Sequence, residues 1–253
     1  MIKLILTDLD HTLLRSDGSI SGRTLFTLER CRDRGLLVAI ATARYWIGSE
    51  KYITMLSPDY EITTDGTLIH SRGECIYSCT LSEEDTEGII QEILRAVPFA
   101  EITAACGSTV YWNSKHIAES EKLHKAVYFE YDRPLGKPAN KIVTALPNDS
   151  IARTIAEKFG CRLQSYRGEN WYGFIPRDSG KTAAINALLG VCSITAEETA
   201  AFGDDINDRQ MLEMCGTGVA VANAVDEVLA IADTVTLSND EDGVAVWIEN
   251  NLL

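Results

Sequence analysis

Asp8 and Asp10 are the first residues in the chain whose types and spacing could do chemistry. They directly follow a short apolar run at residues 3–6, and alternation in an extended segment would put both side chains on the same side of the chain. Two neighbouring carboxylates repel each other strongly unless a cation lies between them. Mg²⁺ is the natural candidate, because this hard ion binds one or two carboxylates together with phosphate oxygens. Taken alone, the stretch is about equally well explained as an Asp-rich turn after a strand.

A second cluster, Thr42-Ala43-Arg44, follows the apolar run at residues 36–41. A hydroxyl together with free backbone N–H groups at a helix start can hold a phosphate group, although Thr42 alone is better explained as an ordinary helix cap. A third candidate is Lys181, in the first turn of a predicted helix at residues 179–189. The helix dipole mildly disfavours a cation there, so an anionic partner would explain it; a solvated surface lysine is the alternative.

The fourth cluster is the most acidic segment of the chain. Asp204, Asp205 and Asp208 lie within five residues of one another where a predicted strand ends. Three carboxylates so close together favour a bound cation over the alternative, a solvated acidic loop. All four clusters lie at strand ends or helix starts, which is the edge at which open α/β sheets bind ligands.

The elements that would position these clusters follow an alternating pattern. Apolar runs at residues 3–6 and 36–41 predict strands, and a further short strand is expected at residues 59–64. Apolar residues at helical spacing predict a helix at residues 21–34, and residues 45–56 form a helix-like segment. Strand, helix and strand in this rhythm indicate a parallel sheet. The same rhythm returns at the end of the chain with a helix at residues 179–189, strands at residues 199–202 and 218–221, a helix through Met211 and a closing helix from Asp242.

The middle of the chain has a different character. From about residue 67 to residue 175 the sequence predicts hairpins mixed with two or three helices, including strands at residues 109–112, 128–131 and 142–146 and helices at residues 82–97 and 148–160. We therefore predict an α/β fold: a Rossmann-like parallel-sheet core with helices on both faces, interrupted by an inserted α+β cap domain. The expected division is residues 1–80 and 176–253 for the core and residues 81–175 for the cap.

Composition narrows the class of protein. The chain has 253 residues, of which 45% are hydrophobic, and its formal net charge is −14 without any block of Lys or Arg. A nucleic-acid partner is therefore not expected, and a phosphate site would have to supply its own local cations. No apolar run is long enough to span a membrane and no signal peptide is recognisable, so we expect a soluble, cytoplasmic protein. The seven scattered cysteines predict reduced, mostly buried thiols.

Together the clusters resemble the haloacid dehalogenase superfamily, in particular its Cof-like phosphatases. The two stretches that carry the resemblance are Asp8-Leu9-Asp10-His11-Thr12-Leu13-Leu14 and the segment 203–212, which begins Gly203-Asp204-Asp205-Ile206-Asn207-Asp208. Their spacing around a cap-sized insert matches the family over essentially the whole chain. The resemblance implies an α/β cap inserted after the third core strand, and a magnesium-dependent phosphatase.

The resemblance also implies roles for single residues. Asp8 would be the nucleophile and Asp10 the general acid and base. Mg²⁺ would be held by Asp8, the backbone carbonyl of Asp10 and Asp204, and Asp208 would support the metal from further away through a water molecule. Four residues would lie on or near the phosphate: Thr42, Ala43, Lys181 and Asn207.

Three positions depart from the family pattern. His11 stands where the family usually has Gly, and we expect its side chain to point to solvent. Ala43 replaces another Gly, which keeps the backbone N–H and adds a methyl group. Asp65 stands where the family usually has Asn, in the stretch Asp65-Gly66-Thr67. If Asp65 faces the site, its charge would favour a leaving group that is rich in hydroxyls or bears an amine; a turn residue bonded to backbone N–H groups is about equally expected.

The function expected from these residues is hydrolysis of a small phosphorylated metabolite, such as a sugar phosphate, through an aspartyl-phosphate on Asp8. A phosphosugar mutase would use the same nucleophile and is the main alternative. A receiver-like or phosphosugar-binding module without turnover is the other, although receivers have about half this length. Substrate identity and oligomeric state are not readable from the sequence. Four aromatic residues fit either the core of the cap or a pocket wall: Trp112, Tyr128, Trp171 and Tyr172.

Overall fold

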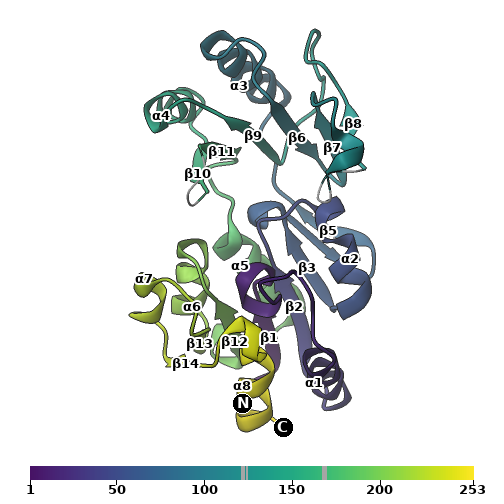
Figure 1. Ribbon diagram of the computed structural model, residues 1–253, viewed down its shortest axis with the longest axis vertical. Coiled ribbons are helices and arrows are strands. Elements are labelled where there is room, and N and C mark those ends of the chain that lie inside the picture. Colours follow the sequence, from purple (N-terminus) through teal and green to yellow (C-terminus); the bar gives the residue numbers. More distant parts are fainter. Residues whose placement is uncertain (121–122, 124, 167–169) are drawn as a thin grey trace.

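The computed structural model describes residues 1–120, 123, 125–166 and 170–253 of the chain. It contains two sheets, each with its own helices (Figure 1). We call the first sheet and its helices the core unit, and the second sheet with α3 and α4 the inserted unit. Figure 1 shows the inserted unit at one end of the molecule and both chain termini at the other. The α/β architecture predicted from the sequence is confirmed.

The core unit has an eight-stranded sheet in the order β14-β13-β12-β1-β2-β3-β4-β5. The strands from β14 to β3 are parallel, and β4 and β5 continue the sheet in antiparallel pairing. The bounds in sheet order are β14 Thr234–Val235, β13 Thr217–Ala220, β12 Thr199–Gly203, β1 Leu4–Thr7, β2 Leu37–Ala41, β3 Tyr60–Thr63, β4 Leu68–Ser71 and β5 Glu74–Ser78. The central strands are buried on both faces, which explains why they read as continuous apolar runs.

Helices cover both faces of this sheet. Helix α1 contacts α2 and α8, whereas α5 contacts α6. Their bounds are α1 Gly22–Asp33, α2 Trp46–Leu56, α5 Lys181–Cys192, α6 Arg209–Met214, α7 Asp226–Leu229 and α8 Gly243–Asn251. The Ser21 side chain caps α1 by accepting from the Thr24 backbone N–H at 3.0 Å, as expected for a serine before an apolar periodic segment.

The inserted unit has a six-stranded sheet in the order β10-β11-β9-β6-β7-β8, antiparallel except for the pair β7 and β8. The bounds in sheet order are β10 Arg162–Ser165, β11 Trp171–Ile175, β9 Lys141–Ala145, β6 Ile102–Cys106, β7 Thr109–Trp112 and β8 Val127–Tyr128. Helices α3 Glu83–Ala96 and α4 Asp149–Lys158 pack on it around a separate apolar cluster that includes Ile90, Ile142 and Phe174.

Several details differ from the sequence predictions. The strand expected at residues 128–131 is only Val127–Tyr128, and Tyr131 has a φ of 57°, which ends any extended run. The sequence predicts no individual strand at β4, β5, β6, β10, β11 or β14, and no helix at the short α7. The seven cysteines are free, but only Cys31 and Cys215 are buried and Cys75 is exposed, so the expectation of mostly buried thiols is wrong. Among the described residues, no helix is long and apolar enough to cross a membrane.

Glu61 on β3 is a buried carboxylate. It is 4% exposed and lies opposite His70 of β4 in the antiparallel register. Burial raises the pKa of Glu61 from 4.5 to about 6 and lowers the pKa of His70, so each group is disfavoured in its charged form. Because the folded protein holds the Glu61 proton more tightly than the unfolded chain does, the contribution of Glu61 to stability is fully present below about pH 4.5 and is lost as the pH rises through about 6.

Replacing Glu61 by Gln is therefore expected to stabilise the protein at high pH only. A difference of about 1.5 pKa units corresponds to about 2 kcal/mol in the free energy of unfolding at pH 8, and to little at pH 4.5. Urea denaturation of the wild type and of Glu61→Gln measures this difference in the free energy of unfolding at each pH value. Glu29→Gln, at an exposed position of α1, is the control. A gain of equal size at both pH values would show that the charge of Glu61 is not its cause.

Candidate active site

The site is built on the carboxyl ends of two neighbouring parallel strands. Strand β1 ends at Thr7 and β12 at Gly203, and Thr7 pairs with Phe202 in the register of the sheet. Asp8 and Asp204, the next residue after each strand, therefore leave the sheet side by side. The backbone N–H of Asp8 donates to the Phe202 carbonyl at 3.0 Å and fixes this position.

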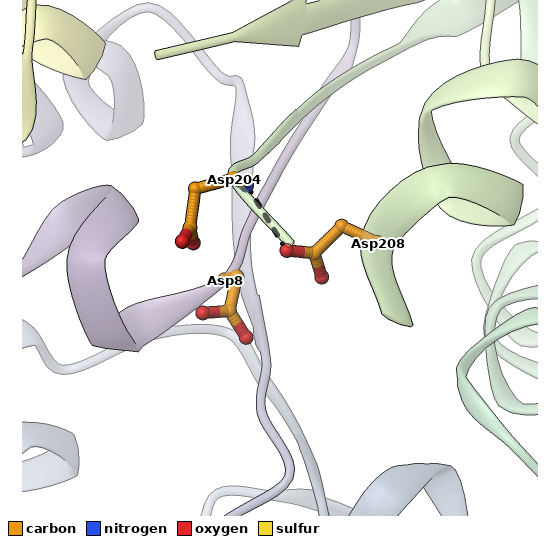
Figure 2. A group of neighbouring side chains, drawn as sticks. All are labelled: Asp8, Asp204 and Asp208. Atoms are coloured by element: carbon orange, nitrogen blue, oxygen red, sulfur yellow. Dashed lines mark hydrogen bonds between the residues drawn. The ribbon is translucent and has the colours of Figure 1, made fainter. Parts of the chain in front are cut away.

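Asp8, Asp204 and Asp208 form one carboxylate cluster (Figure 2). One oxygen from each side chain lies within 4.8 Å of the others. Asp208 closes a single turn, Ile206–Asp208, and its Oδ2 accepts from the backbone N–H groups of Asp204 and Asp205 at 3.1 and 3.2 Å. Gly203 makes room for this turn, because a Cβ at that position would collide with the Asp208 side chain. The geometry offers oxygen ligands from three carboxylates, which suits a hard divalent cation.

Lys181 at the start of α5 is the cation of this cluster. Its Nζ donates to Asp8 Oδ1 at 2.7 Å and to Asp208 Oδ1 at 2.6 Å, and its side chain is only 6% exposed. The anionic partner predicted from its position in the first helical turn is therefore present, and the alternative of a solvated lysine is wrong. Burial alone would lower the pKa of Lys181, but Asp208 and Asp8 together raise it, so the lysine is charged.

The cluster carries more negative than positive charge. Burial raises the pKa of Asp8 well above its ordinary range, although the neighbouring Lys181 acts in the opposite direction. Burial also raises the pKa of Asp204 to about 6, although its oxygen accepts from the Thr12 hydroxyl at 2.6 Å. One lysine faces three carboxylates, so a further cation would stabilise all of them in the charged form.

Asp10 lies apart from this cluster. It sits in a helical turn, Leu9–Leu13, in which Asp10 and His11 have non-helical backbone angles. Its carboxylate accepts from Arg44 Nε at 2.7 Å and Nη2 at 2.5 Å, a two-point pair that fixes the plane of the carboxylate. The alternation expected between Asp8 and Asp10 does not apply, because the strand has ended at Thr7. The sequence predicts no role for Arg44; its only signal there is its place directly after Thr42 and Ala43.

His11 adopts the left-handed conformation, with φ 59° and ψ 3°. A non-glycine residue there costs about 1 kcal/mol, which gives a physical reason for Gly at this position in the family that the sequence resembles. The residue is exposed, as predicted, and Asn223 donates to its carbonyl at 2.8 Å.

The segment Thr42-Ala43-Arg44 forms a tight turn rather than a helix start, since α2 begins only at Trp46. The Thr42 N–H donates to the Ile62 carbonyl, and the Arg44 N–H donates to Thr42 Oγ1 at 3.2 Å. The backbone N–H groups of Thr42 and Arg44 are therefore not free, and the expectation of free N–H groups is wrong for these two. Thr42 Oγ1 is only the acceptor in this bond, so the hydroxyl proton of Thr42 can still be donated to an anion. Asn207, close by in sequence to the carboxylates, has a buried Oδ1 without a hydrogen-bond partner.

A cavity of about 780 Å³ opens beside these groups, between the two units. The core unit contributes Asp10, Ala43, Arg44 and Asp204 to its lining, and the inserted unit contributes Leu123 and Tyr166. None of the four aromatic residues named as pocket candidates lines it: Trp112, Tyr128, Trp171 and Tyr172. Trp112 and Tyr172 are buried in the inserted unit instead. Tyr166 was missed, because nothing in the sequence distinguishes it from other aromatic residues of the insert.

Asp65 does not line this cavity. It lies in the turn Thr64–Gly66, as one of the two expectations had it, but its buried carboxylate is not bonded to backbone N–H groups of the described residues. It pairs instead with Lys141 of the inserted unit at 2.5 Å and accepts from the Tyr166 hydroxyl at 3.1 Å. The pair with Lys141 leaves no signal in the sequence, because its two members come from different units.

Comparison with known proteins agrees with the geometry. The family model described as haloacid dehalogenase-like hydrolase matches residues 5–248. The chain is 26% identical to the 5-amino-6-(5-phospho-D-ribitylamino)uracil phosphatase YitU of Bacillus subtilis, over 97% of this chain and 96% of that protein. It is 30% identical to the HMP-PP phosphatase of Klebsiella pneumoniae, over 99% and 97% of the two chains. A crystal structure of a haloacid dehalogenase-like hydrolase from Bacteroides thetaiotaomicron superposes with a TM-score of 0.85, at 27% identity and 99% coverage of both chains.

Proposed function

The chain belongs to the haloacid dehalogenase-like hydrolase family and is a phosphatase, and we propose that it hydrolyses small phosphorylated metabolites through a phosphoryl group held covalently on Asp8. The observation that carries the proposal is the buried Asp8 carboxylate, oriented by Lys181 and flanked by Asp204 and Asp208. A carboxylate fixed in this way can attack phosphorus in line, because its bond with Lys181 holds its rotamer.

The reaction would proceed in two steps. In the first, an Asp8 oxygen forms a bond to phosphorus while the bond from phosphorus to the leaving oxygen breaks, and Asp10 donates a proton to that oxygen. In the second, Asp10 takes a proton from water, the water oxygen attacks phosphorus, and the bond to Asp8 breaks to release phosphate. Asp10 lines the cavity and Arg44 fixes its orientation, which suits the second step, in which Asp10 is the base. The first step needs Asp10 in its protonated form, which the pair with Arg44 disfavours, so this pair would have to loosen when the substrate binds.

Charge on the phosphoryl oxygens needs compensation. We propose that Lys181, the Thr42 hydroxyl and the Ala43 N–H contact these oxygens, with Asn207 near the transferring group. The carboxylate oxygens of Asp8 and Asp204 are ligands that suit Mg²⁺, and so is the backbone carbonyl of Asp10, which the sequence predicts as a third ligand. When bound, the ion would neutralise charge on the phosphoryl oxygens. Both Asp208 oxygens are occupied by Lys181 and backbone N–H groups, which supports an indirect role for this residue.

The inserted unit, taken as residues 81–175, would act as the cap that closes the cavity and selects the leaving group. A panel of phosphorylated sugars, nucleotides and cofactor precursors, including the named substrates of the relatives, tests the proposal. Release of inorganic phosphate in the presence of Mg²⁺ is the expected result. Formation of an isomeric sugar phosphate without phosphate release would indicate a mutase, and no turnover on any member would contradict hydrolysis.

Asp10→Asn is expected to cause a loss that depends on the leaving group. The amide cannot donate a proton in the manner of a carboxylic acid, so hydrolysis of a sugar phosphate should fall by about 10²–10⁴-fold. The loss should be much smaller for p-nitrophenyl phosphate, whose leaving oxygen needs little protonation. Initial rates on both substrates measure the difference. Equal losses would mean that Asp10 is not the acid, or that dephosphorylation of Asp8 limits both reactions.

A further inference from the structure

Among the described residues, Lys141 of β9 makes a more deeply buried ion pair between the two units than Lys125 does. The Nζ of Lys141 crosses from the inserted unit to the core unit, where it pairs with Asp65 Oδ2 at 2.5 Å and donates to the Ala43 carbonyl at 3.0 Å. The side chain is only 4% exposed. The ammonium group also lies 4.9 Å from the ring centre of Tyr45 and 5.0 Å from that of Tyr166.

This position is costly unless every partner stays in place. A buried ammonium group loses its hydration, and a buried carboxylate left without a partner is strongly destabilising. The two aromatic faces add attraction to the cation without adding hydrogen bonds. Lys141 can therefore occupy this place only when the inserted unit is seated so that Asp65 and Ala43 are both within reach.

The contact with Ala43 controls one peptide group of the proposed phosphate loop. The carbonyl of the Ala43–Arg44 peptide accepts from Lys141, and the N–H of the same peptide donates to Thr42 Oγ1. This peptide plane is thus held at both ends. On one side of it lies the Thr42 hydroxyl, and on the other the Arg44 side chain that orients Asp10.

The contact with Asp65 reaches a second loop of the site. Thr64 donates its N–H to the Arg44 carbonyl at 2.7 Å, so the turn Thr64–Gly66 is tied to the segment 42–44. Gly66 packs against the backbone of Gly180 and Lys181, so closely that a Cβ there would collide with it. The same turn therefore supports the start of α5, from which Lys181 reaches Asp8.

We propose that Lys141 is a positioning residue for the phosphatase reaction: by bridging Asp65 and the Ala43 carbonyl, it couples seating of the inserted unit to the geometry of the phosphate loop and of Asp10. The inference rests on the function proposed above and adds a residue of the inserted unit to it.

Two other contacts between the units also reach these loops: the Tyr166 hydroxyl donates to Asp65, and Arg162 Nη1 donates to the Ser179 carbonyl at 3.0 Å, just before α5. Neither of them bonds the Ala43–Arg44 peptide, which Lys141 does. Further contacts between the units are the Tyr45 hydroxyl with Thr103, an apolar cluster of Ile47, Ala105 and Val110, and the exposed pair of Lys125 and Glu50.

Three variants and a control separate positioning from charge balance. Lys141→Met removes both contacts and leaves Asp65 unpaired; Asp65→Asn keeps an acceptor for Lys141; the double variant removes both charges. Lys125→Met breaks an exposed ion pair between the same two units and is the matched control. Each protein is measured for kcat and KM on p-nitrophenyl phosphate with Mg²⁺, for melting temperature, and for the Kd of inorganic phosphate by calorimetry.

We expect Lys141→Met to lower kcat/KM by about 10–100-fold, mainly through kcat, and to raise the Kd of inorganic phosphate about tenfold. A shift of about 1 Å in the segment 42–44 is enough to cause losses of this size. Its melting temperature should fall by roughly 10 °C. In the double variant the melting temperature should recover by at least half while kcat/KM stays low, since the Ala43 carbonyl still lacks its donor. Lys125→Met should stay within about threefold of the wild type in kcat/KM, whereas Asp65→Asn, which keeps an acceptor for Lys141 but removes its anionic partner, should lie between Lys125→Met and Lys141→Met.

Two results would overturn the inference. One is activity within about twofold of the wild type in Lys141→Met. The other is full recovery of both melting temperature and kcat/KM in the double variant, which would mean that Lys141 only neutralises Asp65. If the wild type binds inorganic phosphate but hydrolyses nothing, the proposed function fails, and the phosphate Kd of the same variants still decides whether Lys141 positions the loop. If the wild type neither hydrolyses nor binds phosphate, both proposals fail together.

Discussion

Asp8→Asn is expected to abolish turnover while the protein stays folded. The amide is nearly isosteric with the carboxylate and keeps an oxygen that can accept from Lys181, so the packing around this buried position is preserved. It is a far weaker nucleophile, and removal of an essential nucleophile costs on the order of 10⁴-fold or more in kcat. Phosphate release from the best substrate of the panel measures the loss, and retention of more than about a hundredth of the activity would contradict covalent catalysis.

The same variant should not lose stability in metal-free buffer. Burial raises the pKa of Asp8, so the folded protein binds that proton more tightly than the unfolded chain does, and stability is lost as the pH rises from below 3.8 through the raised value. Near neutral pH, replacing Asp8 by a neutral amide removes this cost. A melting temperature equal to or above that of the wild type is therefore expected in the presence of a chelator. Asp226→Asn, at the exposed start of α7, is the control for both measurements.

A direct test of the covalent step uses the wild type. Rapid acid quenching during turnover, followed by mass spectrometry of peptides, should find one phosphoryl group on the peptide that contains Asp8. Asp8→Asn should show none. A phosphoryl group on any other residue would transfer the role of nucleophile away from Asp8.

The parts of the site that the sequence predicted are those that sheet geometry places. Asp8 and Asp204 each follow an apolar strand, and the carboxyl ends of parallel strands meet at one edge, so strand assignment alone brought them together. Lys181 was predicted from a local argument of the same kind, a cation in the first turn of a helix. In these cases the signal lies within a few residues of the functional group.

The parts that the sequence did not predict depend on loop paths and on the contact between units. Arg44 reaches Asp10 only because the chain leaves β1 in the turn Leu9–Leu13, with His11 in the left-handed region. Lys141 reaches Asp65 only because the inserted unit is seated on the core unit. Strand β6 was missed because its sequence, Ile-Thr-Ala-Ala-Cys, has few β-branched or aromatic residues, and its place is decided by pairing with β7 and β9.

The remaining large effect concerns the divalent cation. Among the described residues around Asp8, Lys181 pairs with two of the three clustered carboxylates, Asp8 and Asp208, so the cluster is short of positive charge when no ion is bound. Exhaustive chelation is expected to reduce turnover to background, and added Mg²⁺ to restore it. Ca²⁺ should restore it poorly, because its larger and more flexible coordination shell would hold the phosphate less well. Activity that survives chelation would contradict the assignment of the metal.

Asp204→Asn should show that the carboxylates are the ligands. The amide can still accept from the Thr12 hydroxyl, so the loop should keep its shape, but one negative charge is lost from the donor set. We expect the Mg²⁺ concentration for half-maximal activity to rise at least about tenfold, with a smaller change in the rate at saturating Mg²⁺. The rise in melting temperature that Mg²⁺ causes in the wild type should shrink in parallel, which gives a readout independent of turnover. If Asp204→Asn needs the same Mg²⁺ concentration for half-maximal activity as the wild type, the ion binds elsewhere. If only the rate at saturating Mg²⁺ falls, Asp204 orients the phosphate and does not hold the metal.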